Sequence, residues 1–449
     1  MNKYLFVFAY CFVSLAAGAK GVSSQEAVRV AANYCRALEG GNFTARAQAV
    51  KAVEKDGQAC YYIVQFEPEG WALVAADDRV VPVLGYSPAG RYCEDGQPAV
   101  MEGWLNGYAE GIKFAISQSK RARHAAWDAE PVATRAATGK IEPFIQVKWN
   151  QSAPYNKYCP TNTKGQRALV GCVAVAFAQA LSVYQKPEKP VGRNGYTDSD
   201  FGLVSVNYDR EAPYNWEAIM SGAENNTEAA RLLFHCGVAV NMDYGLSASG
   251  SYTQRIVRAL ASYFSYSDAA KYYTRNNYQG DWTQLILNEL AAKRPVIYDG
   301  ANDKGTSAHA FNLDGFDGGN SFHINWGWGG KNNGYFTLEN LNDGNFNYVN
   351  SHGAVVNIAP AGTIASNLAA KETSNIKVYE NTGGEWLLEP AVPGQYHLYT
   401  ISGSHVSGGA FYPGTQTILS PNHPGVSIYI LSLYSEGKKE IRKIIINKN

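Results

Sequence analysis

The chain has 449 residues, in which 39 Lys and Arg residues balance 39 Asp and Glu residues, so its formal net charge is zero. A balanced charge excludes the electrostatic binding of nucleic acid that a strongly basic chain would favour. Aromatic residues make up 12% of the chain and include 30 Tyr and 9 Trp, which excludes a disordered chain and favours β-rich globular domains.

Residues 1–19 have the pattern of a secretory signal peptide. A basic residue precedes an apolar run over 4–15, and a small-residue cleavage site ends at Ala19. The run is too short to span a membrane comfortably. We therefore expect a secreted protein, or one at the cell surface or in the periplasm. Attachment as a lipoprotein through Cys11 is an alternative that the bulky residue before this cysteine disfavours.

Export places the six remaining cysteines in an oxidising compartment, but they are too few and too widely spaced for a disulfide scaffold. The sequence has no CxxC pair and no Cys/His group with zinc-ligand spacing, so we expect no metal and no other cofactor. At least one thiol is expected to be free. The pairing of Cys35, Cys60 and Cys93 stays open.

The first block after the signal, from 20 to about 125, combines strands and a helix. Residues 60–90 alternate apolar and polar side chains between turn signals, which predicts a small antiparallel sheet. Residues 101–127 have helical periodicity. Residues 128–143 are small and polar without apolar periodicity, which predicts an exposed linker of the kind that proteases cut.

The central block, from about 144 to 360, predicts helices first and antiparallel strands second, an α+β arrangement. Helices are expected directly after Cys172 and over 227–240 and 252–264, and strands over 294–300, 309–316, 321–328 and 334–340. The last block, 361–449, has the pattern of hairpins in a small β-sandwich, without a cluster of catalytic residue types.

The segment GCVAVAFAQAL places Cys172 between a glycine and a helix of small and apolar residues. The unpaired N–H groups of a helix N-terminus favour a thiolate, the nucleophilic form of cysteine. A thiolate also needs a base or a cationic partner. On these residues alone Cys172 is either a buried packing residue or a nucleophile.

His309, at the start of a strand after a loop of small residues, is the best placed partner for this thiol. An imidazole base needs an orienting group on its other ring nitrogen. Asn325 on the next strand supplies one only if a loop of odd length or a single bulge shifts the register by one residue. The turn FDGGNS has glycines that allow the shift, which places Asn325 on the same face as His309, diagonally across the strand pair.

Taken in order, WNQSAPYN, GCVAVAFAQAL, VNMDYG, HAFNLDGF and FHINWGWGG resemble the streptopain family of secreted bacterial cysteine peptidases over about 140–360. The resemblance implies a papain-like catalytic domain with a helical lobe and an antiparallel sheet lobe. It also implies that Cys172 is the nucleophile. His309 would be the general base that becomes the acid for the leaving amine.

Further roles follow from the same resemblance. Gln151 resembles the family's oxyanion-hole glutamine, which would act together with the backbone N–H of Cys172. Asn325 would orient His309, and Trp326 would shield that hydrogen bond from water. The spacing from Gln151 to Cys172 is shorter than in the family, so the intervening loop must be trimmed.

Gly250 and Ala308 fall where family members line the substrate cleft, but the residues around them differ, which leaves the side-chain preference open. Simpler interpretations exist for the supporting residues. Gln151 could be a surface amide, Trp326 and Trp328 could be core aromatics, and the glycine-rich segment 327–334 could be a plain turn or a mobile wall of the cleft.

The first block, which contains GWALVAADDRVVPVLGYS, is similar to the inhibitory pro-domain of this family. Activation is expected near Arg135-Ala136 in the exposed linker, with KRARH over 120–124 as an alternative cut point. We therefore predict four parts: a signal peptide over 1–19, an α+β pro-domain over 20–135, a peptidase domain over 136–360, and a β-sandwich accessory or sorting domain over 361–449.

The hypothesis is a monomeric, secreted cysteine endopeptidase that is made as a zymogen and cleaves proteins or peptides. Its own pro-domain is the expected inhibitor, and no metal or nucleic acid is expected. One alternative is an inactive family member that acts as a binding or inhibitor protein, which the presence of Cys172, His309, Gln151 and Asn325 opposes. A transglutaminase-like enzyme is opposed by Asn325, where such enzymes usually carry Asp. The sequence lacks the GxSxG and HExxH motifs of serine hydrolases and metallopeptidases.

Overall fold

The computed structural model describes residues 20–38, 43–95, 97, 99–118, 122–128, 139–301, 308–338, 352–363, 376–380, 386–400, 405–419, 425–435 and 438–448. The predicted signal peptide and the predicted activation site at Arg135-Ala136 lie outside the described residues. The chain divides into two compact units, Met1–Thr363 and Ile364–Asn449, and each is described by itself.

The first unit begins with a helix, four antiparallel strands and a second helix. These elements are α1 (Ser24–Leu38), β1 (Arg46–Lys55), β2 (Gln58–Glu67), β3 (Trp71–Ala75), β4 (Val83–Ser87) and α2 (Ala99–Ser117). The pairing of β2 with β3 and of β3 with β4 confirms the antiparallel sheet predicted for 60–90.

Helix α2 ends at Ser117, so the prediction of one helix over 101–127 is wrong at its C-terminal end. The chain after α2 is bound to the loop between β3 and β4 instead of extending the helix. The backbone N–H of His124 donates to the carbonyl of Asp78, and Arg123 pairs with the Asp78 carboxylate. A short 3₁₀ turn, η1 (Ala125–Trp127), follows.

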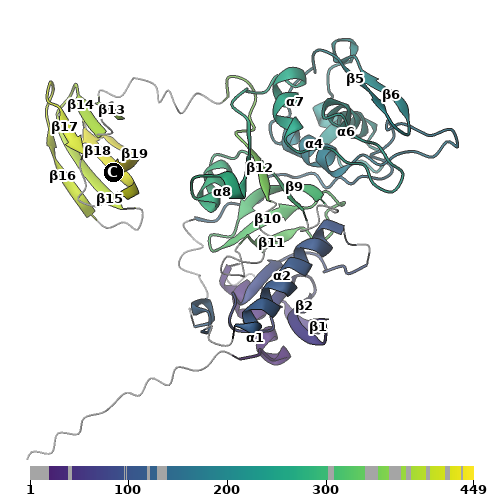
Figure 1. The fold of residues 1–449 in the computed structure, drawn as a ribbon, viewed down its shortest axis with the longest axis horizontal. Helices are drawn as coiled ribbons and strands as arrows, with labels where there is room; N and C mark the ends of the chain where they lie inside the picture. Colours follow the sequence, from purple (N-terminus) through teal and green to yellow (C-terminus); the bar gives the residue numbers. More distant parts are fainter. Residues whose placement is uncertain are drawn as a thin grey trace, which may run out of the picture. The chain divides into compact units, whose positions relative to one another are not determined.

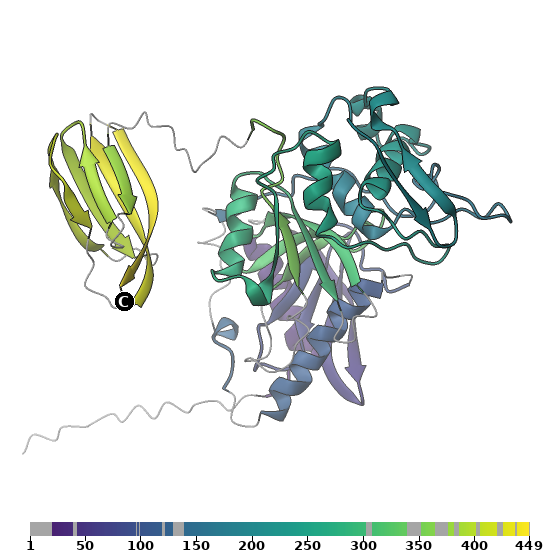
Figure 2. The ribbon, with the colours of Figure 1, turned by 45° about the horizontal axis from the view of Figure 1, so that its top comes forward.

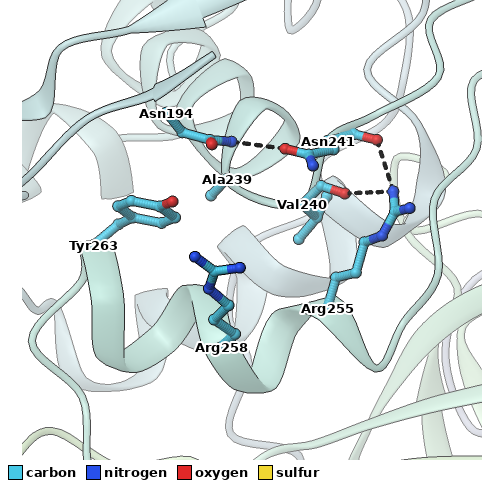
Figure 3. A pocket seen from close by; sticks show the side chains of 7 residues that line it. All are labelled: Asn194, Ala239, Val240, Asn241, Arg255, Arg258 and Tyr263. Carbon is cyan, nitrogen blue, oxygen red and sulfur yellow. Dashed lines mark hydrogen bonds between the residues drawn. The ribbon is translucent and has the colours of Figure 1, made fainter. Parts of the chain in front are cut away.

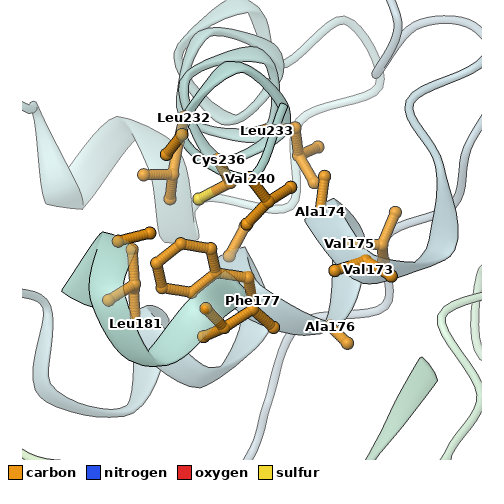
Figure 4. Close-up of a cluster of buried hydrophobic side chains, with 14 of the residues drawn as sticks. Val173, Ala174, Val175, Ala176, Phe177, Leu181, Leu232, Leu233, Cys236 and Val240 are labelled. Atoms are coloured by element: carbon orange, nitrogen blue, oxygen red, sulfur yellow. The ribbon is translucent and has the colours of Figure 1, made fainter. Parts of the chain in front are cut away.

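Helices dominate the next part of the chain. Its elements are α4 (Cys172–Tyr184), the hairpin β5 (Asn194–Asp198) and β6 (Gly202–Val206), η2 (Tyr208–Arg210), α5 (Trp216–Met220), α6 (Thr227–Ala239) and α7 (Arg255–Tyr263). Figure 4 shows Phe177 and Leu181 of α4 packed with Leu232 and Cys236 of α6 in one buried apolar cluster. The three helices predicted from apolar periodicity are confirmed.

Strands follow the helices. The elements are β7 (Lys271–Thr274), η3 (Arg275–Asn277), α8 (Trp282–Ala291), β8 (Val296–Ala301), β9 (Ala308–Phe316), β10 (Ser321–Asn325), β11 (Gly334–Thr337) and β12 (Gly353–Val356). Strand β10 is shorter than the predicted strand over 321–328, because the chain turns at Gly327, whose φ is 72°. The predicted mixture of helices and antiparallel strands is confirmed.

One sheet of ten strands, in the order β1-β2-β3-β4-β11-β10-β9-β8-β12-β7, runs through the first unit (Figures 1 and 2). The N-terminal strands join it where β4 pairs with β11. The two strands lie so close that a Cβ on Gly85 would be 2.6 Å from a ring carbon of Phe336. Side chains of α2 share a buried apolar cluster with β9, β10 and β11.

The second unit consists of two antiparallel sheets. One has the order β13-β14-β17 and the other the order β16-β15-β18-β19, and both contribute to one buried cluster. The strands are β13 (Ile376–Glu380), β14 (Trp386–Pro390), β15 (Gly394–Thr400), β16 (His405–Phe411), β17 (Thr417–Leu419), β18 (Gly425–Ser435) and β19 (Lys438–Lys448).

Candidate active site

Cys172 is the first residue of α4, and its side chain is partly exposed. Gly171 before it has a φ of 89°, a conformation that favours glycine. A Cβ on Gly171 would lie 2.6 Å from Sδ of Met242 and 3.1 Å from the carbonyl oxygen of Ser249. The chain thus turns through a space that suits only glycine and places the thiol at the N-terminus of α4.

His309 lies on β9, and its imidazole is close enough to the thiol of Cys172 for the two groups to shift each other's pKa. On its other side, Nε2 lies 3.1 Å from the backbone carbonyl oxygen of Trp326. Because a carbonyl only accepts hydrogen bonds, Nε2 carries a hydrogen and Nδ1 is the nitrogen left for the sulfur. The structure therefore brings the predicted thiol and imidazole together.

The surroundings of this pair favour its charged form. Burial opposes ionisation of the thiol, but the positive charge and hydrogen bond of His309, with the N–H groups of Ala310 and Val173, lower the pKa of Cys172. Burial also disfavours a charged imidazole, but the Cys172 thiolate, its hydrogen bond and the Trp326 carbonyl raise the pKa of His309. The arrangement can hold a thiolate beside an imidazolium, as nucleophilic acyl transfer requires.

Asn325 does not orient the imidazole. Its Oδ1 accepts hydrogen bonds from Nε2 of Gln179 at 3.1 Å and from the backbone N–H of Gly327 at 3.2 Å. The contact predicted between Asn325 and His309 is therefore wrong. The backbone carbonyl of Trp326 takes the position on the imidazole that was expected for the Asn325 amide.

The register of β9 and β10 explains this difference. Five residues, 317–321, separate the paired residues Phe316 and Phe322, which is the odd-numbered spacing that the prediction needs. A β-bulge within the same strand pair then shifts the register back, so that Asn325 pairs with Asn312. Either feature alone would give the predicted register. Because both occur, they cancel, and Asn325 lies on the face opposite His309.

The two tryptophans after β10 differ in their surroundings. Trp326 is fully buried, with its ring centroid 4.9 Å from that of Phe311 and 5.3 Å from that of Phe336. The ring beside the imidazole belongs to Trp328, whose centroid lies 6.4 Å from that of His309 at an interplanar angle of 28°. Sequence reasoning gave Trp328 no site role, because nothing in the WGWGG pattern tells which ring faces the histidine.

The remaining predicted residues lie near the thiol or next to the imidazole in the chain. Gln151 is buried, and its backbone carbonyl accepts the N–H of Val170 at 2.9 Å. Val170 lies two residues before Cys172 in the chain. Gly250 follows the Ser249 carbonyl that borders the turn before α4, and a Cβ on Gly250 would meet open space. Ala308 opens β9 directly before the histidine, and its side chain lies outside the described residues.

A pocket separate from this pair lies between α7 and the end of α6 (Figure 3). Arg255 donates to the backbone carbonyls of Val240 and Asn241 there, at 3.2 and 3.0 Å. These bonds cap the carbonyl end of α6, where a cation is favourable and an anion is not. The position of Arg255 in the pocket is therefore explained by helix capping.

Three further features concern the described part of the chain: its cysteines, possible metal sites and possible membrane-spanning helices. Among its cysteines, Cys60, Cys93, Cys159, Cys172 and Cys236 are free thiols, so neither Cys60 nor Cys93 is part of a disulfide. Within that part, no three His, Cys, Asp or Glu side chains gather as a metal site requires. The same residues include no helix with the length and apolar character to cross a membrane.

Known proteins with similar sequences share this site region. A model of the peptidase C10 family matches residues 149–336, the segment that contains Cys172 and His309. Streptopain from Streptococcus pyogenes is 31% identical over 332 residues, which cover 67% of this chain and 80% of streptopain. The chain belongs to the peptidase C10 family. The family resemblance predicted from the sequence is therefore confirmed.

A second C10 relative, the thiol protease/hemagglutinin PrtT of Porphyromonas gingivalis, is 31% identical over 347 residues. The match covers 72% of this chain but 39% of PrtT, so most of that relative lies outside it. A solved structure of a prointerpain A fragment from Prevotella intermedia is 28% identical, with a TM-score of 0.58, and covers 69% of this chain and 98% of that one.

A model of the Spi protease inhibitor matches residues 19–112 of this C10 chain. The prointerpain fragment is likewise a precursor by its name. The chain is a cysteine endopeptidase with an inhibitor-like N-terminal region, which is the organisation of a zymogen. These two predictions from the sequence are confirmed.

Proposed function

We propose that this C10 peptidase is exported as a zymogen and cleaves proteins through the thiolate of Cys172 and an acyl-enzyme. The observation that carries the proposal is the pair of Cys172 and His309, in which each group shifts the pKa of the other. It joins a lowered thiol pKa to a raised imidazole pKa at the N-terminus of a helix. This pairing gives the sulfur both the negative charge and the nearby proton that peptide hydrolysis needs.

In the proposed reaction the Cys172 sulfur attacks the carbonyl carbon of the scissile bond, and the carbonyl oxygen becomes an oxyanion. The proton on His309 passes to the leaving amine as the C–N bond breaks, which leaves a thioester on Cys172. His309 then removes a proton from water, whose oxygen attacks the thioester. The carboxylic acid leaves, and the thiolate–imidazolium pair forms again.

We propose supporting roles for the groups around this pair. The backbone N–H of Cys172 and the Gln151 side chain would stabilise the oxyanion. Gln151 is fixed next to the turn before α4, which supports this role. The Trp326 carbonyl would hold the imidazole, and Trp328 would limit the access of water to it. Gly250 and Ala308 would border the substrate.

The arrangement is proposed to be papain-like. The cluster around α4 and α6 would form the helical lobe, and the strands β7–β12 would form the sheet lobe, with the cysteine and the histidine on opposite sides of the cleft. The pro-domain over 20–135 would be released by cleavage near Arg135-Ala136. Its continuity with the catalytic sheet through β4 and β11 supports a tightly bound inhibitor.

The remaining parts of the hypothesis concern the cell and the partners. We propose that residues 1–19 are removed on export and that the enzyme acts as a monomer on protein or peptide substrates outside the cytoplasm. The second unit, from Ile364 onward, would be a stabilising, adhesive or sorting module.

The test is self-processing of the purified full-length protein, followed by hydrolysis of casein. The wild type is expected to shorten itself by cleavage between about 130 and 141 and then to cleave casein, and Cys172→Ala to do neither. Cys93→Ala is the matched control, because Cys93 is the other partly exposed free thiol among the described cysteines. It should behave as the wild type does.

Each other outcome has a definite meaning. Casein hydrolysis by Cys172→Ala would contradict the proposal. A folded wild type that stays inactive after its N-terminal region has been removed by an added protease would favour the binding or inhibitor protein. N-terminal sequencing of an active form that still begins near Lys20 would contradict the activation site.

A further inference from the structure

Three amide side chains are buried together between α4, β9 and β10. Gln179, Asn312 and Asn325 are each at most 1% exposed. Nδ2 of Asn312 donates to Oε1 of Gln179 at 3.0 Å, and Nε2 of Gln179 donates to Oδ1 of Asn325 at 3.1 Å. We refer to these three residues as the amide bridge. If the oxygen and nitrogen of the Gln179 amide were exchanged, its NH₂ group would face the NH₂ group of Asn312, and neither could accept a hydrogen bond.

Gln179 is the central member of the amide bridge. The outer members also reach backbone carbonyls: Asn312 donates to Ala176 at 3.0 Å, and Asn325 donates to Val147 at 3.1 Å. Gln179 binds the other two members with both ends of its amide. Since a buried amide that loses its partner destabilises the fold, the position of each outer member depends in part on Gln179.

The amide bridge and the thiol lie on the same side of α4. Positions 172, 176 and 179 are four and seven residues apart, which places them on one face of a helix. On this face Cys172 meets His309 of β9, and two turns later Gln179 meets Asn312 of the same strand. The opposite face carries the apolar contacts with α6 shown in Figure 4. Gln179 thus joins the helix of the nucleophile to the strand of the base.

The other end of the bridge leads to the carbonyl that orients the imidazole. Oδ1 of Asn325 accepts the backbone N–H of Gly327 at 3.2 Å, which closes a tight turn around Trp326. The carbonyl within this turn is the one that lies 3.1 Å from Nε2 of His309. One glutamine side chain therefore connects the segments that carry the thiol, the imidazole and the orienting carbonyl.

We propose that Gln179 is a positioning residue of this peptidase. It holds Cys172, His309 and the Trp326 carbonyl in fixed positions relative to one another and does not contact the substrate. The inference rests on the proposed peptidase function. Reacting groups must be held close to their productive geometry, and a shift of about 1 Å from a distant change can lower turnover about 100-fold. The amide bridge connects three such groups at once.

The first variant is Gln179→Met, which has a side chain of similar length without the amide. In the matured enzyme we expect kcat to fall about 10- to 100-fold while KM stays within about twofold. The alkaline limb of the pH profile should move to lower pH, because the Nε2–H of His309 loses its fixed acceptor and the imidazolium is less stabilised. These quantities are measured with a fluorescent casein.

The matched control is Ser182→Ala on the same helix. Ser182 is also buried, but its hydroxyl donates to the backbone carbonyl of Gln179 and not to the amide bridge. This variant removes a buried hydrogen bond from α4 and should leave kcat and both limbs of the pH profile as in the wild type.

A second variant, Gln179→Glu, tests the donor itself. The introduced carboxyl group can still accept from Asn312, but it can donate to Asn325 only when protonated. We therefore expect its activity to be closest to that of the wild type at acidic pH and to fall as the carboxyl group ionises. A role in packing alone predicts no such recovery at acidic pH.

The proposal is overturned if both variants fold and keep the wild-type kcat and pH limbs. It is also overturned if Gln179→Met scales the whole pH profile down in proportion to the folded fraction, measured by circular dichroism, without moving a limb. Failure of the peptidase proposal itself is distinct, because the wild type would then show neither casein hydrolysis nor a lowered pKa in the alkylation of Cys172.

Discussion

At the residue scale, Cys172 and His309 define a pH window for activity. Burial opposes both charges, but His309 lowers the pKa of Cys172 and Cys172 raises the pKa of His309, so both shifts favour the thiolate–imidazolium pair. We expect kcat/KM of the matured enzyme to rise through the first pKa and to fall through the second. A rate that rises only through the ordinary thiol range near pH 8.5 would contradict the charged pair.

Gly171 determines where the thiol lies, because its φ of 89° starts α4 beside Met242 and Ser249. Gly171→Ala adds both backbone strain and a close contact, so we expect a loss of about 1–3 kcal/mol in the free energy of unfolding together with lower activity. The measurement is urea denaturation with casein hydrolysis.

The control for this change is Gly165→Ala. Gly165 also has a positive φ, 73°, but nothing lies within 4 Å of its Cβ position. It should lose some stability from strain and keep the activity of the folded protein. Equal losses of activity in the two variants would show that Gly171 has no special role at the thiol.

At the element scale, the sequence predicts local structure well and pairing less well. The apolar periodicity after Cys172 predicts α4, and the alternation around His309 predicts β9, because each pattern is set by one element and its burial. The position of Asn325 depends on a turn and a bulge whose shifts cancel. Neither feature has a pattern in the sequence strong enough to show that both occur, so the orienting carbonyl of Trp326 could not be predicted.

Helix α2 covers the catalytic strands through Trp104. Its ring lies 5.2 Å from His352, 5.9 Å from Phe311 and 6.1 Å from Trp326, measured between centroids. Trp104→Ala would leave a cavity at this contact and lower the free energy of unfolding by about 3–5 kcal/mol. We therefore expect the full-length protein to unfold at a lower temperature and to process itself faster than the wild type.

Trp127→Ala is the control for Trp104→Ala. It should destabilise the N-terminal region without removing the contact of α2 with the peptidase strands. The Trp127 indole donates to the carbonyl of Val80, within the N-terminal region itself. If Trp127→Ala accelerates processing as much as Trp104→Ala does, the N-terminal region is released because it is generally unstable and not because the contact of α2 is lost. Unchanged processing of Trp104→Ala would argue against inhibition through this contact.

At the scale of the whole molecule, the inhibitor-like region and the peptidase strands share one sheet. The pairing of β4 with β11 joins residues about 250 positions apart, Gly85 with Phe336. Sequence patterns predicted each region separately but carried no information on this pairing, because alternation shows which face of a strand is buried and not which strand lies beside it. For the proposed zymogen, the shared sheet is a physical reason why the full-length protein would stay inactive until the chain is cut.

The second unit is expected to be dispensable for catalysis. The thiol, the imidazole and the amide bridge all belong to the unit that ends at Thr363. Deletion of 364–449 should therefore leave kcat/KM for casein unchanged, since the first unit keeps its own cores. Loss of activity in a truncated protein that is still folded by circular dichroism would show that the second unit contributes to the site.

The central claim is that the Cys172 sulfur shares a proton with His309, and the rate of iodoacetamide alkylation at Cys172 against pH tests it most directly. We expect an inflection below the ordinary thiol pKa of about 8.5 in the wild type. In His309→Ala the inflection should move above that of the wild type, because burial remains and the positive charge is gone. A wild-type inflection at or above the ordinary value, unchanged in His309→Ala, would contradict the account.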